Sequence, residues 1–93
     1  MSYTFKWDTN KAIANWKKHR VTFTEAMQIF FDDLSSTIAD EEHSDSEKRF
    51  VTIGESKRNR ILVVSHTEEE SEIRIISARV ASKREKQQYQ EHG

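Results

Sequence analysis

The chain has 93 residues, 33% of them charged and 34% hydrophobic. This is enough for one domain, residues 1–93, with a thin core and a heavily ionised surface. The absence of cysteine excludes disulfides and thiolate metal sites. The longest apolar run, residues 61–64, is too short to cross a bilayer, and the N-terminus lacks the apolar core of a signal peptide. We therefore expect a cytoplasmic protein with no membrane partner.

The net charge of −1 conceals an uneven distribution. Residues 1–47 carry five Lys or Arg and nine Asp or Glu, whereas residues 48–93 carry ten and seven. This polarity is compatible with an anionic substrate at the C-terminal half and a basic partner elsewhere on the molecule.

The N-terminal residues predict a short strand followed by a helix. Residues 3–7 alternate aromatic and polar side chains, as a strand does, and Asp8 or Thr9 can cap the helix that follows. We expect this helix to end near residues 19–20. Its apolar stripe is formed by Ala12, Ile13 and Trp16.

A second helix begins at a capping box made by Thr22 and Glu25, and Val21 can pack against Ala26 one turn inside. Apolar residues then recur at the spacing of a helix that faces a core. They are Phe23, Ala26, Met27, Phe30 and Phe31.

Two helices joined by a short turn also suggest a DNA-binding helix-turn-helix. The second helix, however, carries Glu25, Asp32 and Asp33 and has no Lys or Arg, so DNA phosphates would repel it. We therefore reject this interpretation.

Residues 32–47 are polar and acidic, and they contain at most a short edge strand near Thr37, Ile38 and Ala39. His43, Asp45 and Glu47 resemble a set of metal ligands, but no second histidine lies at ligand spacing. A solvated loop is the favoured interpretation, and we expect no metal site.

Three strands follow, at residues 49–53, 61–66 and 73–77. The connections through Gly54 and through the acidic residues 68–70 both suit antiparallel hairpins. The sequence therefore predicts an α+β fold in which a small antiparallel β-sheet packs against two N-terminal helices, with a short C-terminal helix. Alternation along the middle strand places Leu62, Val64 and His66 on one face.

Residues 73–89 form the most informative stretch, because a strand passes directly into a helix that starts with a capping box of Ser82 and Glu85. Four cations surround this junction, which therefore attracts phosphate. They are Arg74, Arg79, Lys83 and Arg84. The helix offers little apolar surface besides Tyr89, so a partner would have to complete its packing.

A set of residues spread over nearly the whole chain shares a characteristic order and spacing. Its members are Trp7, Asp8, Lys11, Asn15, Lys18, His19, Phe23, Glu25, Ala26, His43, Ser44, Glu47, Arg49, Ile53, Gly54, residues 62–64, His66, Thr67, residues 74–79, Ala81, Lys83, Glu85 and Tyr89. In this order the chain resembles the BrnT-type toxins of bacterial type II toxin-antitoxin systems, which have a RelE-like ribonuclease fold. Two positions depart from the pattern: Arg20 replaces a glycine after the first helix, and Val80 replaces a basic residue.

The resemblance implies cleavage of messenger RNA, which inhibits translation. It also implies neutralisation by a cognate BrnA-type antitoxin in a hetero-oligomer, and contact with operator DNA only through that antitoxin. No cofactor is implied.

Metal-independent RNA cleavage requires a base for the 2′-hydroxyl, cations for the phosphorane and an acid for the leaving 5′ oxygen. Arg79 and Arg49 are our choice for the phosphorane charge, because guanidinium groups bind phosphate in a bidentate manner. Arg74, Lys83 and Arg84 are the expected substrate-binding cations.

The sequence leaves the proton-transfer groups open between His66, Glu47 and Glu85. His66 has the most suitable ordinary pKa, although a histidine at a strand end is often a packing residue. Glu85 has a structural task in the capping box. A non-catalytic module that binds RNA or protein through the same basic edge is the alternative function.

Overall fold

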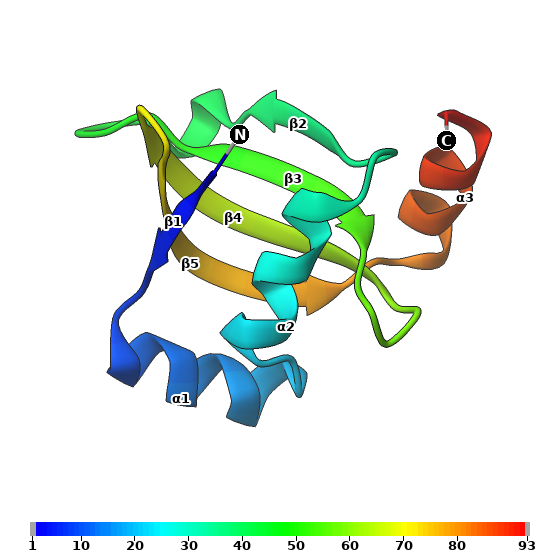
Figure 1. Cartoon of the computed structure of the whole chain (residues 1–93), viewed down its shortest axis with the longest axis horizontal. Helices are drawn as coiled ribbons and strands as arrows, with labels where there is room; N and C mark the ends of the chain where they lie inside the picture. Colours follow the sequence, from blue (N-terminus) through cyan, green and yellow to red (C-terminus); the bar gives the residue numbers. More distant parts are fainter. Residues whose placement is uncertain (1, 93) are drawn as a thin grey trace.

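The computed structural model describes residues 2–92, with the side chain of residue 92 left out. The helices and strands follow one another along the chain as Figure 1 shows. The elements are β1 (Thr4–Lys6), α1 (Thr9–His19), α2 (Phe23–Gln28), the 3-10 helix η1 (Ile29–Phe31), β2 (Ser36–Ala39), the 3-10 helix η2 (Glu41–His43), β3 (Phe50–Glu55), β4 (Ile61–Glu69), β5 (Glu72–Val80) and α3 (Lys83–His92).

Within the described residues, five strands form one sheet in the order β1-β5-β4-β3-β2. The predicted α+β class and the β3-β4-β5 hairpins are confirmed. The prediction of a wholly antiparallel sheet is wrong, because β1 pairs parallel to β5, with Phe5 opposite Ile73. This pairing joins strands more than sixty residues apart, so no local pattern could indicate it.

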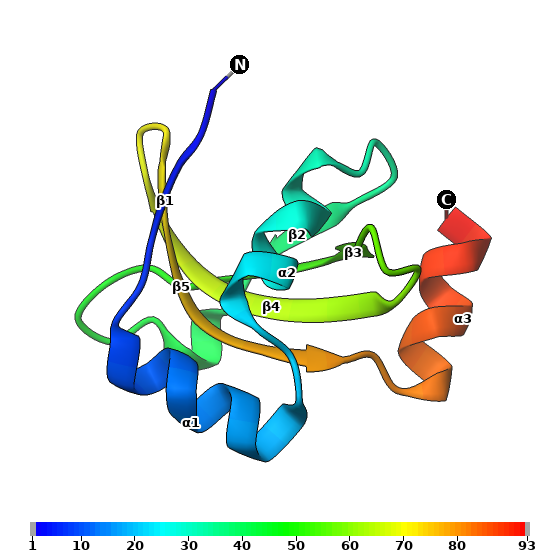
Figure 2. The ribbon, with the colours of Figure 1, turned by 60° about the horizontal axis from the view of Figure 1, so that its bottom comes forward.

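The core lies between the sheet and the layer of α1 and α2 (Figure 1). From the helical side it receives Val21, Phe23, Ala26 and Ile29, and from the sheet Leu62, Val64, Ile73, Ile75 and Ala78. The β4-β5 pair is strongly bent (Figure 2), and the register shift between Ser65 and His66 accounts for the bend. Helix α3 stands apart, beyond the end of β5 (Figures 1 and 2).

The second predicted helix is interrupted after Gln28, where the chain tightens into η1. A 3-10 helix has fewer residues per turn than an α-helix, so the side chains rotate relative to the expected stripe. Ile29 is therefore fully buried, whereas Phe31 is 62% exposed. The assignment of Phe31 to the core was wrong for this reason.

The apolar stripe predicted on α1 also faces solvent in part, since Ile13 is 50% and Trp16 41% exposed. The buried residue of this helix is Asn15. Its amide nitrogen donates to the carbonyls of Ala78 (2.8 Å) and Val21 (3.0 Å), and its oxygen accepts from the Ala78 amide (3.0 Å). Asn15 thus hydrogen-bonds the edge of β5 beyond the point where β1 ends.

The predicted helix caps are confirmed. Asp8 accepts from the amide of Lys11 (3.1 Å), and Thr22 accepts from the amide of Glu25 (3.0 Å). Arg20 caps the C-terminus of α1 with a φ of 57°, a left-handed conformation in which glycine is favoured. Its guanidinium lies over the Trp16 ring, 5.4 Å from the centroid.

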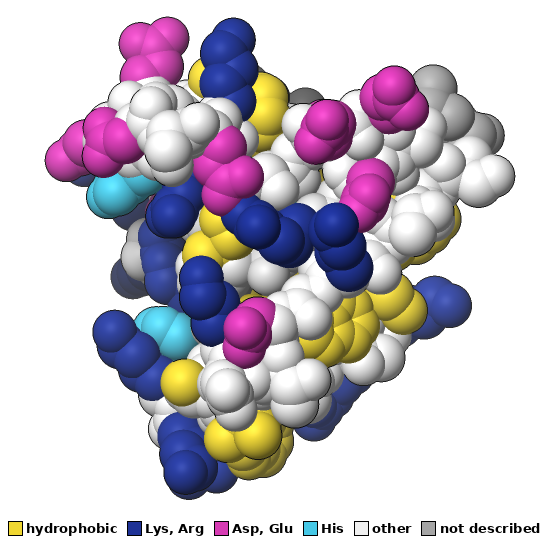
Figure 3. Space-filling model, turned by 90° about the vertical axis from the view of Figure 1, so that its left-hand side faces the viewer, with side chains coloured by type: hydrophobic (Ala, Val, Ile, Leu, Met, Phe, Trp, Pro, Cys, Tyr) yellow, Lys and Arg dark blue, Asp and Glu magenta, His cyan; other side chains and the backbone are white. Residues whose placement is uncertain are grey.

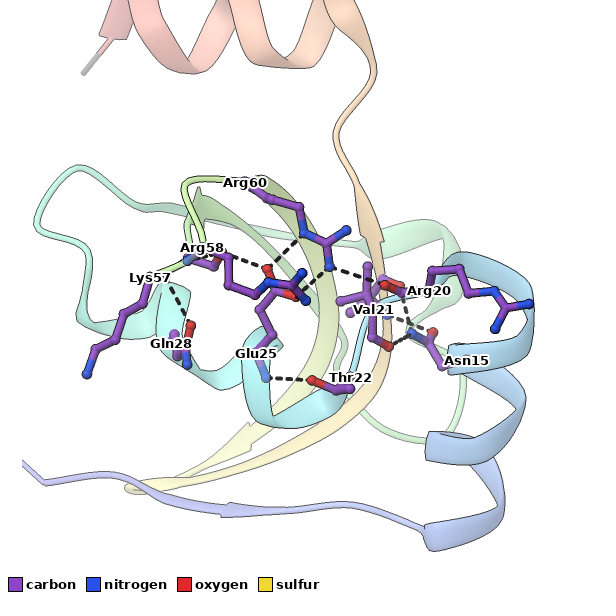
Figure 4. A network of polar contacts seen from close by, with 11 residues as sticks. Asn15, Arg20, Val21, Thr22, Glu25, Gln28, Lys57, Arg58 and Arg60 are labelled. Carbon is purple, nitrogen blue, oxygen red and sulfur yellow. Dashed lines mark hydrogen bonds and ion pairs between the residues drawn. The ribbon is translucent and has the colours of Figure 1, made fainter.

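The β3-β4 turn is bonded to α2 through Glu25, whose side chain is buried (Figure 4). Glu25 accepts from Nε of Arg60 (3.0 Å) and from the hydroxyl of Ser56 (2.7 Å). The hydrogen bond from Arg60 is the largest cause of the lowered pKa of the Glu25 carboxyl. Much of the basic character of this turn is therefore used to hold the fold together.

Candidate active site

The sheet face opposite α1 and α2 carries a regular array of side chains. Strand register places Ile53, Val63 and Arg79 in one row, and Val51, Ser65 and Ser77 in the next. Side chains alternate between the two faces, and Leu62 and Val64 belong to the core. We call this second surface the open face.

Arg79 lies at the end of the open face near α3 and is bonded to Glu85. Its two terminal nitrogens donate to the two carboxylate oxygens at 2.7 and 2.9 Å. Glu85 also completes the capping box, since it accepts from the Ser82 amide (2.8 Å) while its own amide donates to the Ser82 hydroxyl (3.2 Å). The predicted capping box is therefore confirmed, and it fixes the position of Arg79 as well.

The hydrogen bond from Arg79 lowers the pKa of the Glu85 carboxyl to about 2, against a smaller opposing effect of burial. Glu85 is thus an anion at neutral pH and holds no proton to donate. The Arg79 side chain remains 44% exposed, so a phosphate can reach it from solvent.

Arg74 lies at the opposite end of the open face, where it forms an ion pair with Glu47. A second ion pair, between Lys6 and Glu72, lines the same small pocket of about 70 Å³. Figure 3 shows this side of the molecule, on which a band of Lys and Arg side chains lies below a border of carboxylates. The end of the sheet at Arg74 therefore carries charges of both signs, since Glu47, Glu69 and Glu72 lie beside Lys6 and Arg74.

Arg49 directly precedes Phe50, the first residue of β3. Because Phe50 pairs with His66, Arg49 lies level with Thr67 and Arg74. Its amide donates to the Ser44 hydroxyl (3.0 Å), its carbonyl accepts from the Asp40 amide (2.8 Å), and its side chain forms no ion pair within residues 2–92. Strand geometry places the backbones of Arg49 and Arg79 on the order of 15 Å apart on the same face. The two residues therefore lie on the same face but at different ends of it.

His66 lies on the same face of β4 as Leu62 and Val64, as alternation predicted, and this is the core face, on which His66 is completely buried. Its Nε2 is 2.7 Å from the Thr52 hydroxyl, which is 2.7 Å from the Thr37 hydroxyl, and its ring packs against Phe30 and Phe50. Burial lowers the pKa of the imidazole to about 4. Substrate on the open face cannot contact this ring, so the structure does not support its choice as a catalytic residue.

Lys83 and Arg84 are exposed in the first turn of α3, next to the capping box. Neither forms an ion pair within the described part of the chain. They extend the cationic surface beyond Arg79, which is compatible with the predicted contact with substrate.

The sequence did not indicate a groove of about 560 Å³ between β2, β3 and α3. Its lining includes Leu34, Ile38, Val51 and Ile53 from the sheet side and Glu85 and Tyr89 from α3. Tyr89 is 8% exposed and its hydroxyl donates to Asp32, so it holds α3 over the groove. The alternation of Val51 and Ile53 could have predicted the apolar floor, but the position of α3 could not be predicted.

Among residues 2–92, no three His, Cys, Asp or Glu side chains gather closely enough to hold a metal ion. The helices of this described part are all too short or too polar to span a membrane.

Residues 7–85 match the family described as ribonuclease toxin, BrnT, of type II toxin-antitoxin system. The chain belongs to the BrnT family. This match confirms the resemblance seen in the sequence. Membership of the family implies a ribonuclease toxin with an antitoxin partner.

The BrnT fold is also found among solved structures. The Brucella abortus ribonuclease toxin BrnT superposes with a TM-score of 0.69 and 22% sequence identity. The match covers 88% of this chain and all of the Brucella chain. A comparison with curated proteins gives no match.

Proposed function

We propose that this BrnT-family chain is a metal-independent endoribonuclease that cleaves messenger RNA on the open face and thereby inhibits translation. Residues 1–93 act as one toxin domain in the cytoplasm. A cognate BrnA-type antitoxin neutralises it in a hetero-oligomer and provides its only link to operator DNA. The observation that carries this proposal is the exposed guanidinium of Arg79, positioned by the capping box at the start of α3.

RNA cleavage by this route breaks the bond between phosphorus and the 5′ oxygen. The 2′ oxygen attacks phosphorus and loses its proton, negative charge accumulates on the pentacoordinate phosphorane, and the departing 5′ oxygen gains a proton. Arg79 stabilises the phosphorane by exchanging one partner for another: the scissile phosphate replaces the Glu85 carboxylate in the same bidentate geometry.

The other cations bind the flanking RNA. Arg74 and Arg49 lie level with each other across Thr67 and contact phosphates away from the scissile one. Lys83 and Arg84 contact the strand on the other side of Arg79. We assign Arg74 and Arg79 to different phosphates because their positions lie on the order of 12 Å apart along β5.

Of the three candidate proton-transfer groups, only Glu85 lies beside a phosphate bound by Arg79. His66 is enclosed in the core, and Glu47 is bonded to Arg74 at the distant end of the face. Glu85 is ionised while it is bonded to Arg79, so it holds no proton for the leaving oxygen, but the carboxylate that the phosphate displaces can accept the 2′-hydroxyl proton. Charge stabilisation by Arg79 remains the principal contribution, and solvent water protonates the leaving 5′ oxygen.

The occupied guanidinium of Arg79 favours one alternative, a non-catalytic module that binds RNA or protein at the same surface. Primer extension on messenger RNA incubated with the purified chain and EDTA separates the two functions. The proposed enzyme cuts at discrete positions, and Arg79→Ala abolishes these cuts whereas Lys57→Ala, which removes a cation from the β3-β4 turn, does not. Absence of cleavage by the wild-type chain would favour the module.

A further inference from the structure

Strand β2 is the last strand of the sheet, and one of its edges has no neighbouring strand within residues 2–92. All four of its residues are exposed, and none is charged or proline. Natural sheets usually protect such an edge with charges, proline or a covering segment. The uncovered edge of β2 is therefore available for hydrogen bonds with the backbone of another chain.

The groove next to this edge is apolar. Ile38 of β2 is 65% exposed and Leu34 just before the strand is 52% exposed, and both line the groove together with Val51 and Ile53. A strand added to β2 would place every second side chain on the open face, directly beside Ile38. The edge and the groove thus form one continuous surface.

The chain segment that contains Leu34 and β2 is acidic. Residues 32–47 include seven Asp or Glu and no Lys or Arg. Such a border repels RNA phosphates, and it would also repel a second copy of the same chain, because pairing of two β2 strands brings both acidic segments together. It attracts a segment that carries Lys and Arg.

We propose that β2 and the adjacent groove bind an extended segment of the antitoxin in which apolar residues alternate with Lys or Arg. The backbone of this segment extends the sheet, its apolar side chains fill the groove, and its cations face the acidic border. The inference rests on the proposed function in one respect, namely that the protein partner of this chain is an antitoxin. Because Glu85 both lines the groove and binds Arg79, the bound segment ends beside the candidate active site.

The location is tested by calorimetry with the purified antitoxin encoded in the same operon, in the absence of RNA. Ile38→Asp and Leu34→Asp place a charge in the groove, and each should raise the Kd by about tenfold or more. Ile13→Asp is the matched control, since this apolar side chain is also half-exposed but lies on α1. It should leave the Kd within about twofold of the wild-type value.

The chemistry is tested by the triple variant Asp33→Asn, Glu41→Gln, Glu42→Gln. It should bind the antitoxin more weakly and with a smaller dependence on salt than the wild type. Hydrogen exchange should show slower exchange of the amides of residues 36–39 in the complex. Thermal unfolding of each variant establishes that it is folded.

Three results would overturn the inference: an unchanged Kd for both groove variants, absence of any complex, or a homodimer that Ile38→Asp dissociates. None of these results bears on cleavage, which is measured with RNA and without antitoxin. Failure of the ribonuclease proposal would conversely leave the binding measurements valid.

Discussion

Arg79 and Glu85 form a bidentate pair at 2.7 and 2.9 Å, and the same carboxylate caps the first turn of α3. The cation proposed to bind the scissile phosphate is therefore held in place by an anion that competes with that phosphate. Both groups are partly exposed, so their attraction adds little to stability, and it mainly fixes geometry.

Replacement of Glu85 by Gln should increase the affinity for RNA. Glutamine can retain the capping box, but it releases the guanidinium and removes a negative charge beside the phosphate. We expect the Kd for a non-cleavable 2′-O-methyl oligoribonucleotide to fall by about threefold to tenfold, as measured by fluorescence anisotropy. Glu91→Gln, an exposed change on the same helix, serves as the control. An equal effect of both substitutions would show that only net charge matters.

Arg49 and Arg74 should affect binding more than catalysis. Both residues lie away from the phosphate at Arg79, so they bind the RNA equally well in the ground state and in the transition state. Arg49→Ala and Arg74→Ala should therefore raise KM by about fivefold to tenfold with little change in kcat. Steady-state kinetics on a short RNA separates the two parameters. A selective loss of kcat would instead place the scissile phosphate at the Arg74 end of the face.

His66 should make the fold sensitive to acid. Its pKa of about 4 in the folded chain lies below the ordinary value of 6.5, so only the unfolded chain gains a proton as the pH falls between these values. Above pH 6.5 the imidazole is neutral in both states and does not change the free energy of unfolding. By pH 4.5 we expect this free energy to have fallen by about 2–3 kcal/mol. Urea unfolding at several pH values should show this slope in the wild type and a flatter one in His66→Gln. Equal slopes in the wild type and in His66→Gln would show that His66 does not cause the acid sensitivity.

Asn15 should be essential for stability. Asn15→Ala removes three hydrogen bonds and leaves the backbone groups of Ala78 and Val21 without these partners in the interior. We expect a loss of about 2–4 kcal/mol in urea unfolding. Asn10→Ala, at an exposed position of the same helix, should change the stability by less than about 1 kcal/mol. A small effect of Asn15→Ala would mean that solvent replaces these bonds.

The sequence could predict what depends on near neighbours. The capping residues Asp8, Thr22 and Ser82 act within three residues of themselves, and the hairpins follow from alternation and turn residues. The parallel pairing of β1 with β5 and the role of Asn15 depend on contacts between distant segments, which no local pattern contains.

The candidate site was predictable to a similar extent. Arg79 and Glu85 lie close to the strand-to-helix junction in the sequence, and the structure pairs them there. Alternation placed His66 on the same face as Leu62 and Val64, but it could not show that this face is the core, and the chemistry of the imidazole suggested catalysis. The separation of Arg49 from Arg79 required the strand register, and the groove beneath α3 required the position of that helix.

The single-turnover cleavage rate of Arg79→Ala and Arg79→Lys, measured with EDTA on a short RNA, tests the central claim most directly. If Arg79 stabilises the phosphorane, Arg79→Ala should lower the rate by about 100-fold or more, and Arg79→Lys should recover only part of it, because lysine lacks the bidentate geometry. Lys57→Ala should cleave at the wild-type rate. A rate for Arg79→Ala within about twofold of wild type would contradict the claim.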